Sequence, residues 1–178
     1  ATLAVSDKIK TPEPYRVDDT IIYPSGESEK NLKIIEEAAA QSALSLGIEN
    51  GIAHVELSMT DNGPVLFELG ARCGGYAPEL VPYLTGVNEI QEFIRVTTGQ
   101  PPEKTVPEYQ KGATVKFFYA KPGKIVRIDG VEDVLGSQNL LRLHFFLGVG
   151  DTVKPVTATT DRVGYLITKG ENRQEALD

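Results

Sequence analysis

The sequence predicts an α+β fold in which an antiparallel sheet with flanking helices is followed by a small β-rich subdomain. Three observations support this prediction. Apolar residues recur at helical spacing from Glu29 to Leu46. Two apolar runs flank the turn residues 61–63, as in a β-hairpin. Beyond residue 111 the pattern is that of short strands, and 178 residues are enough for one domain or two small lobes.

In the first half of the chain, turn and cap residues separate the expected elements. Ser25 or Ser28 can cap the long helix at its N-terminus, and Gly47 can end it. The expected elements are strands at 2–7 and 15–23, a helix at 29–46, a hairpin within 54–72, and short helices at 78–84 and 88–97.

A proline-rich segment, residues 99–107, is the expected boundary between two lobes. We therefore expect a first domain at 1–99, a connector at 100–110 and a β-rich subdomain at 111–178. Pro122-Gly123 suits a type II turn. The expected strands of the subdomain are 111–120, 124–128, 140–147 and 162–169.

Composition excludes several classes of function. The net charge of −7 argues against nucleic acid as a partner and is compatible with a bound divalent cation. No stretch approaches the roughly 20 apolar residues of a membrane span, and no signal peptide is visible. The single cysteine, Cys73, excludes an internal disulfide and favours a reducing compartment, so we expect a cytoplasmic protein.

Both ends of the chain look like cuts through a longer protein. The sequence opens without Met on an apolar run and closes at 171–177 on what resembles the first turns of a helix. The alternative is ordinary processing of a complete small protein.

The hairpin is expected to oppose two carboxylates. With Asp61-Asn62-Gly63 as a three-residue loop, Glu56 faces Glu68 and His54 faces Gly70. Side chains alternate across a strand, so the other face would be an apolar core. That face contains Val55, Leu57, Met59, Val65, Phe67 and Leu69. A two-residue Asn62-Gly63 loop would mix carboxylate and core on one face, which disfavours it.

Such a pair needs a cation, because β-carbons directly opposed in a sheet lie only about 4.5–5.5 Å apart. Mg²⁺ takes hard oxygen ligands, often one or two carboxylates completed by substrate phosphates. Arg72 leaves the strand on the carboxylate side, and backbone N–H groups at Gly74 and Gly75 precede a helix start that favours anions. Together these residues predict a phosphoryl-transfer site. The alternative is a solvated sheet face on which each glutamate pairs with Lys or Arg.

Residues 51–99, with His54-Val55-Glu56 and Glu68-Leu69-Gly70-Ala71-Arg72-Cys73-Gly74-Gly75, resemble the metal-binding core of the ATP-grasp ligases. That family has one glutamate on a strand and Glu-x-Asn-x-Arg about a dozen residues later. Within the superfamily the chain most resembles the L-amino-acid ligase branch, close to carbamoyl-phosphate synthase and biotin carboxylase. The tail, with Lys121–Lys124 and Arg162–Tyr165, resembles the small C-terminal subdomain of that branch.

The resemblance implies an ATP- and Mg²⁺-dependent carboxylate–amine ligase that works through an acyl phosphate on small-molecule substrates. Glu56 and Glu68 would hold the metal, and Arg72 would be catalytic. The residues implied at the ATP and substrate site are His54, Gly74 and Gly75, although a structural role is the alternative for His54.

Two features depart from this pattern. Gly70 stands where the family usually has Asn, which removes one oxygen ligand. No glycine-rich phosphate loop precedes the helix at 29–46, so the N-terminal lobe of the ligase is expected to be missing and the chain alone inactive. A homodimer is possible. The rival interpretation is a non-catalytic binding or scaffold module that keeps a degenerate ATP-grasp fold.

Overall fold

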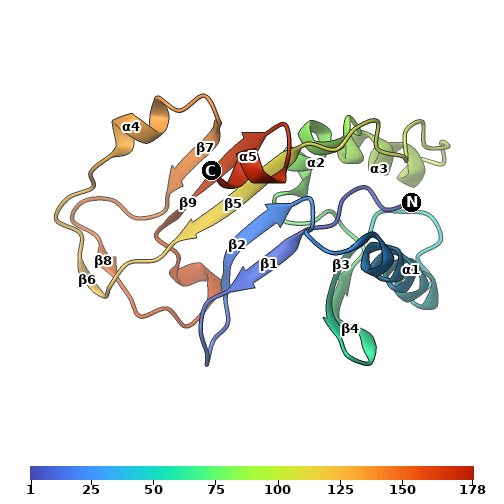
Figure 1. The fold of residues 1–178 in the computed structure, drawn as a ribbon, viewed down its shortest axis with the longest axis horizontal. Coiled ribbons are helices and arrows are strands. Elements are labelled where there is room, and N and C mark those ends of the chain that lie inside the picture. Colours follow the sequence, from blue (N-terminus) through green and yellow to red (C-terminus); the bar gives the residue numbers. More distant parts are fainter. The chain divides into compact units, whose positions relative to one another are not determined.

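The computed structural model describes residues 1–178 (Figure 1). The chain forms two compact units. The first unit contains Ala1–Val5 and Gly26–Gln110, and the second unit contains Ser6–Ser25 and Lys111–Asp178. Antiparallel strands and flanking helices confirm the predicted α+β class. No helix is both long enough and apolar enough to cross a lipid bilayer.

The second unit is discontinuous in sequence, which differs from the expected division into 1–99 and 111–178. Its sheet takes in β1 (Asp7–Lys10) and β2 (Asp18–Tyr23), and β2 pairs with β5 (Gly112–Phe118). This pairing joins strands that are far apart along the chain, and no local pattern in the sequence indicates it. The proline-rich segment does lie near a boundary, since the first unit ends at Gln110.

In the first unit, one helix packs on a hairpin and two short helices follow. The elements are α1 (Glu29–Ser45), β3 (His54–Thr60), β4 (Gly63–Gly70), α2 (Ala77–Thr85) and α3 (Glu89–Thr97). Ser28 caps α1, because its hydroxyl accepts a hydrogen bond from the Asn31 amide at 3.2 Å. The chain leaves α1 through Gly47, whose φ of +76° is in the left-handed region. α1 contacts both strands of the hairpin.

The second unit is built on a five-stranded antiparallel sheet of order β1-β2-β5-β9-β7 (Figure 1). β7 spans Leu140–Phe145 and β9 spans Gly164–Gly170. The short helix α5 (Arg173–Leu177) packs against β5 and β9. The core of this unit includes Ala113, Val115, Phe117 and Ile167, all fully buried on the two central strands.

The predicted strand at 124–128 is wrong in its extent and in its partner. The expected strand at 124–128 does not form a hairpin with the preceding strand. Only Gly123–Lys124 is a strand here (β6), and it pairs with β8 (Thr152–Val153) instead. The remaining elements are α4 (Val131–Leu135) and the 3-10 helix Thr159–Asp161.

The hairpin register agrees with the prediction at its base and differs at its tip. His54 pairs with Gly70 and Glu56 pairs with Glu68, as predicted. The turn, however, has two residues, since Thr60 pairs with Gly63. A bulge next to Glu56 inserts Phe67 into β4 and restores the predicted pairs at the base.

The bulge changes which side chains share a face of the hairpin. Leu66 now opposes Leu57, and Val65 opposes Ser58 on the side of the carboxylates. The prediction that Val65 and Phe67 lie in the core is wrong, because Phe67 is 72% exposed and Val65 is exposed as well.

Replacing Gly170 by Ala tests the packing of α5 on the sheet. A β-carbon at Gly170 would lie 2.6 Å from both the Ala176 amide nitrogen and the Glu175 β-carbon. We expect Gly170→Ala to lower the free energy of unfolding by about 2–3 kcal/mol, measured by chemical denaturation. Gly148→Ala is the matched control, because the nearest atom to its β-carbon is 3.9 Å away. Equal effects of the two substitutions would contradict the packing described.

Candidate functional site

The two glutamates of the hairpin point to the same side of the sheet, because they are direct partners across β3 and β4. Glu56 is half-buried and Glu68 is exposed. Two opposed carboxylates destabilise a pair of strands unless positive charge lies close to them. This arrangement therefore favours binding of a cation on that side of the hairpin.

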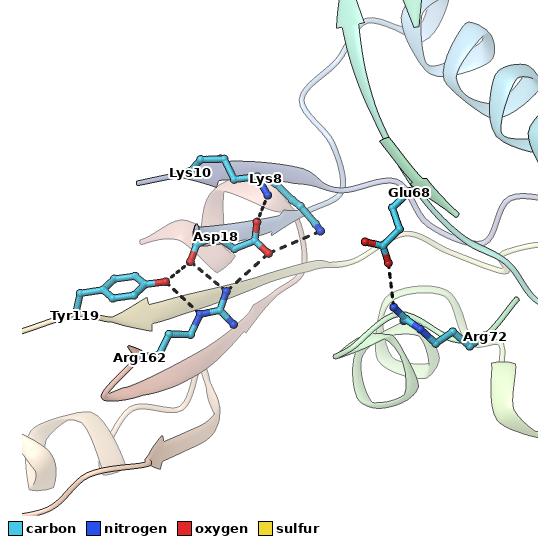
Figure 2. A network of polar contacts seen from close by, with 7 residues as sticks. All are labelled: Lys8, Lys10, Asp18, Glu68, Arg72, Tyr119 and Arg162. Atoms are coloured by element: carbon cyan, nitrogen blue, oxygen red, sulfur yellow. Dashed lines mark hydrogen bonds and ion pairs between the residues drawn. The ribbon is translucent and has the colours of Figure 1, made fainter. Parts of the chain in front are cut away.

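Arg72 supplies positive charge to one of the two carboxylates. Its Nη2 lies 3.3 Å from Oε1 of Glu68 (Figure 2). Its Nη1 donates a hydrogen bond to the Cys73 carbonyl oxygen at 2.9 Å. The Arg72 and Glu68 side chains are 57% and 58% exposed, so water screens their attraction and a competing ion can displace the guanidinium.

Gly70 makes room for this position of the arginine. A β-carbon at Gly70 would lie 3.3 Å from both Cγ and Nε of Arg72. The Arg72 amide also donates to the Gly70 carbonyl oxygen at 2.8 Å, which turns the chain sharply at the end of β4. The absence of a side chain at position 70 thus lets Arg72 fold back along the strand toward Glu68.

The Cys73-Gly74-Gly75 loop packs against the start of β3. A β-carbon at Gly74 would lie 2.9 Å from Cδ2 of His54, so the imidazole and the loop backbone are in close contact. Gly75 has open space around it, with no atom within 4 Å of a β-carbon built there. α2 begins two residues later without a side-chain cap, and such a helix N-terminus favours negative charge.

Glu89, at the start of α3, is a buried carboxyl group that no motif in the sequence marks. Its side chain is 4% exposed, and its Oε1 has no hydrogen-bond partner. Burial raises the pKa of Glu89, and a hydrogen bond from the Cys73 thiol acts in the opposite direction. Burial and the nearby Glu89 raise the pKa of the Cys73 thiol to about 11, so this thiol stays protonated at neutral pH and is a poor nucleophile.

In the second unit, a separate polar network surrounds Asp18 (Figure 2). Lys10 forms an ion pair with Asp18, and Lys8 and Arg162 each approach Oδ2 of Asp18 at 3.8 Å. The Tyr119 hydroxyl donates to the Asp18 carbonyl oxygen at 2.6 Å and accepts from Nε of Arg162 at 3.1 Å. The network ties together β1, β2 and the segments after β5 and before β9.

No three His, Cys, Asp or Glu side chains come together as a metal-binding group. A metal on the hairpin would therefore have at most the two glutamates as carboxylate ligands and would need further oxygen ligands from water or substrate. Mg²⁺ accepts this arrangement, because it usually keeps waters and phosphate oxygens in its shell.

Comparisons with known proteins point to one group of enzymes. Residues 116–178 match the model of the L-amino acid ligase C-terminal domain 2. The chain is 24% identical to dapdiamide A synthase of Enterobacter agglomerans over 84% of this chain and 37% of that protein. It thus spans little more than a third of that relative.

Solved structures share the fold. The crystal structure of L-amino acid ligase from Bacillus licheniformis matches 98% of this chain and 44% of its own, with a TM-score of 0.84 and 24% identity. The biotin carboxylase domain of the Hydrogenobacter thermophilus 2-oxoglutarate carboxylase, solved with MgADP, ADP and bicarbonate, matches 99% of this chain and 39% of its own. Its TM-score is 0.67 and its identity 16%.

These findings confirm the resemblance inferred from the hairpin and the glycine loop. The chain has the fold of the C-terminal portion of the ATP-grasp ligases, and its residues 116–178 are similar to the L-amino acid ligase C-terminal domain 2.

Proposed function

We propose that the whole protein is an ATP- and Mg²⁺-dependent carboxylate–amine ligase that works through an acyl phosphate, and that this chain carries its metal-binding and phosphoryl-transfer residues. The observation that carries the proposal is the pairing of Glu56 with Glu68, with the Arg72 guanidinium 3.3 Å from Glu68. The similarity to dapdiamide A synthase and L-amino acid ligase supports the reaction class.

In this proposal each residue has a distinct task. Glu56 and Glu68 hold Mg²⁺, which when bound neutralises charge on the triphosphate of ATP. Arg72 moves from Glu68 to the transferring phosphoryl group, where its planar guanidinium binds phosphate oxygens. Gly74 and Gly75 bring backbone N–H groups close to the carboxylate substrate, and His54 supports the loop by packing against Gly74.

The chemistry consists of two transfers, and these residues assist both by position and charge. A substrate carboxylate oxygen attacks the γ-phosphorus of ATP, and ADP leaves. The amine nitrogen then attacks the carbonyl carbon of the acyl phosphate, loses a proton, and inorganic phosphate leaves. Arg72 faces the same anionic group in both steps, first on ATP and then as the leaving phosphate.

Replacing Glu68 by Gln tests the metal role. This substitution keeps the size of the side chain but removes its negative charge, so we expect Mg²⁺-dependent ADP release to fall by at least about a hundredfold with the fold intact. The measurement is a coupled ADP assay on the whole protein, with circular dichroism as the check on folding. Asp61→Asn, at the exposed tip of the same hairpin, is the matched control.

If the activity of Glu68→Gln stays within about threefold of wild type, Glu68 is not a ligand of the metal. A wild-type protein that folds and binds Mg²⁺ but releases no ADP with any carboxylate–amine pair would favour the rival function, a binding module on the same fold.

Replacing Arg72 by Gln tests phosphoryl transfer. We expect kcat to fall by about 10²–10³, with the KM for ATP nearly unchanged, because Arg72 would act on charge that develops in the transition state. Arg72→Lys should recover only part of the loss, since an ammonium lacks the planar fork. Steady-state kinetics provide the readout, with Arg127→Gln, an exposed arginine paired with Asp129, as control. A rise in KM alone would assign Arg72 to ground-state binding.

A further inference from the structure

α3 carries acidic side chains on its buried face and isoleucines on its exposed face. Glu89 and Glu92 are buried, whereas Ile94 is 56% exposed and Ile90 is also exposed. Helices normally bury the apolar side chains and leave the acids in water. A buried acid is costly unless it has partners, so each of these two needs a reason to be inside.

Glu92 has such a reason in the local backbone. Its Oε2 accepts a hydrogen bond at 2.8 Å from the Glu103 amide and so fixes the chain that follows α3. Glu89 has no comparable contact. The Cys73 thiol donates to its carboxyl group, and Oε1 has no hydrogen-bond partner. The stability of α3 therefore does not explain the burial of Glu89.

Cys73 connects Glu89 to the hairpin site. Its thiol contacts Glu89, and its backbone carbonyl oxygen accepts a hydrogen bond from Nη1 of Arg72 at 2.9 Å. Nη2 of the same guanidinium lies 3.3 Å from Glu68. One continuous path of contacts thus runs from Glu89 through Cys73 and Arg72 to Glu68.

The Cys73-Gly74-Gly75 loop is held at two points: Glu89 contacts Cys73, and His54 contacts Gly74. Gly74 packs against the His54 ring. Gly75 has no close neighbours, and the Arg72 side chain is largely exposed. The Arg72 guanidinium has two polar contacts, with Glu68 and with the Cys73 carbonyl oxygen, so its direction depends in part on where that carbonyl points.

We propose that Glu89 is a positioning residue: it holds the Cys73 side chain and thereby sets the carbonyl group that orients Arg72 for phosphoryl transfer. The role of Arg72 in phosphoryl transfer rests on the proposed function. The contact between Glu89 and Cys73 is independent of it. A buried carboxyl kept at a cost to stability is what such a role requires.

Glu89→Met provides the sharpest test, because it removes the carboxyl group and keeps a similar side-chain volume. We expect the melting temperature to rise, since an unsatisfied buried group is lost, while kcat for ADP release falls about tenfold or more. Glu89→Gln, which retains an acceptor for the thiol, should recover most of the activity. Glu92→Met is the matched control on the same face, and it should lower the melting temperature while leaving kcat within about threefold.

The reactivity of Cys73 gives a readout that does not depend on ligase activity. Alkylation by iodoacetamide can be followed at this one residue by peptide mass spectrometry on the whole protein. Loss of the Glu89 contact frees the thiol and removes a nearby negative charge, so Glu89→Met should speed alkylation about tenfold. Glu92→Met should leave the rate unchanged.

The outcomes separate this inference from the proposed function. An unchanged alkylation rate in Glu89→Met would contradict the proposal that Glu89 holds the Cys73 side chain. Faster alkylation with unchanged kcat would contradict the proposal that Glu89 orients Arg72 through Cys73. If wild-type protein itself releases no ADP, the proposed function fails, and the alkylation rates still decide whether Glu89 holds Cys73.

Discussion

The site depends on one electrostatic constraint, the opposition of Glu56 and Glu68 across a hairpin. Two carboxylates in direct register repel each other and weaken the pairing of their strands unless positive charge lies close to them. In this structure the Arg72 guanidinium lies against Glu68, and Gly70 leaves it the space to do so. In the proposed reaction Glu56 and Glu68 would hold Mg²⁺, whose positive charge would neutralise both carboxylates. Binding of the metal would then release Arg72 for the phosphoryl group, so that one arrangement links metal loading to catalysis.

The sequence alone predicts that Glu56 opposes Glu68, but it does not predict the length of the turn or the bulge in β4. A three-residue loop without a bulge and a two-residue turn with a bulge place Glu56 opposite Glu68 equally well. The extra residue in β4 compensates for the shorter turn. The error therefore affected every pair from Leu57 to the turn, and with them the exposure of Val65 and Phe67. The bulge could not be predicted because Val65, Leu66 and Phe67 are all apolar, so the sequence pattern does not show which of them is the extra residue.

Long helices, caps and short helices followed from local pattern, as at Ser28 and Gly47. The second unit did not, because β2 pairs with β5 far along the chain. α3 is the most instructive case. Its apolar spacing indicates a helix correctly but suggests the wrong buried face, since Glu89 and Glu92 point inward. Only the partners of these acids, Cys73 and the Glu103 amide, explain that orientation. The signal available in the sequence was the spacing of Glu89 and Glu92, which places both on one face of the predicted helix.

Direct binding of Mn²⁺, a paramagnetic substitute for Mg²⁺, shows whether Glu56 and Glu68 hold one ion together. Free Mn²⁺ is counted by electron paramagnetic resonance as it is titrated into the whole protein and into Glu56→Gln and Glu68→Gln. We expect one metal site whose affinity falls at least about tenfold in either variant, because both carboxylates hold the same ion. Binding in both variants that equals wild type would contradict this expectation, since the opposed glutamates would then not be the metal ligands.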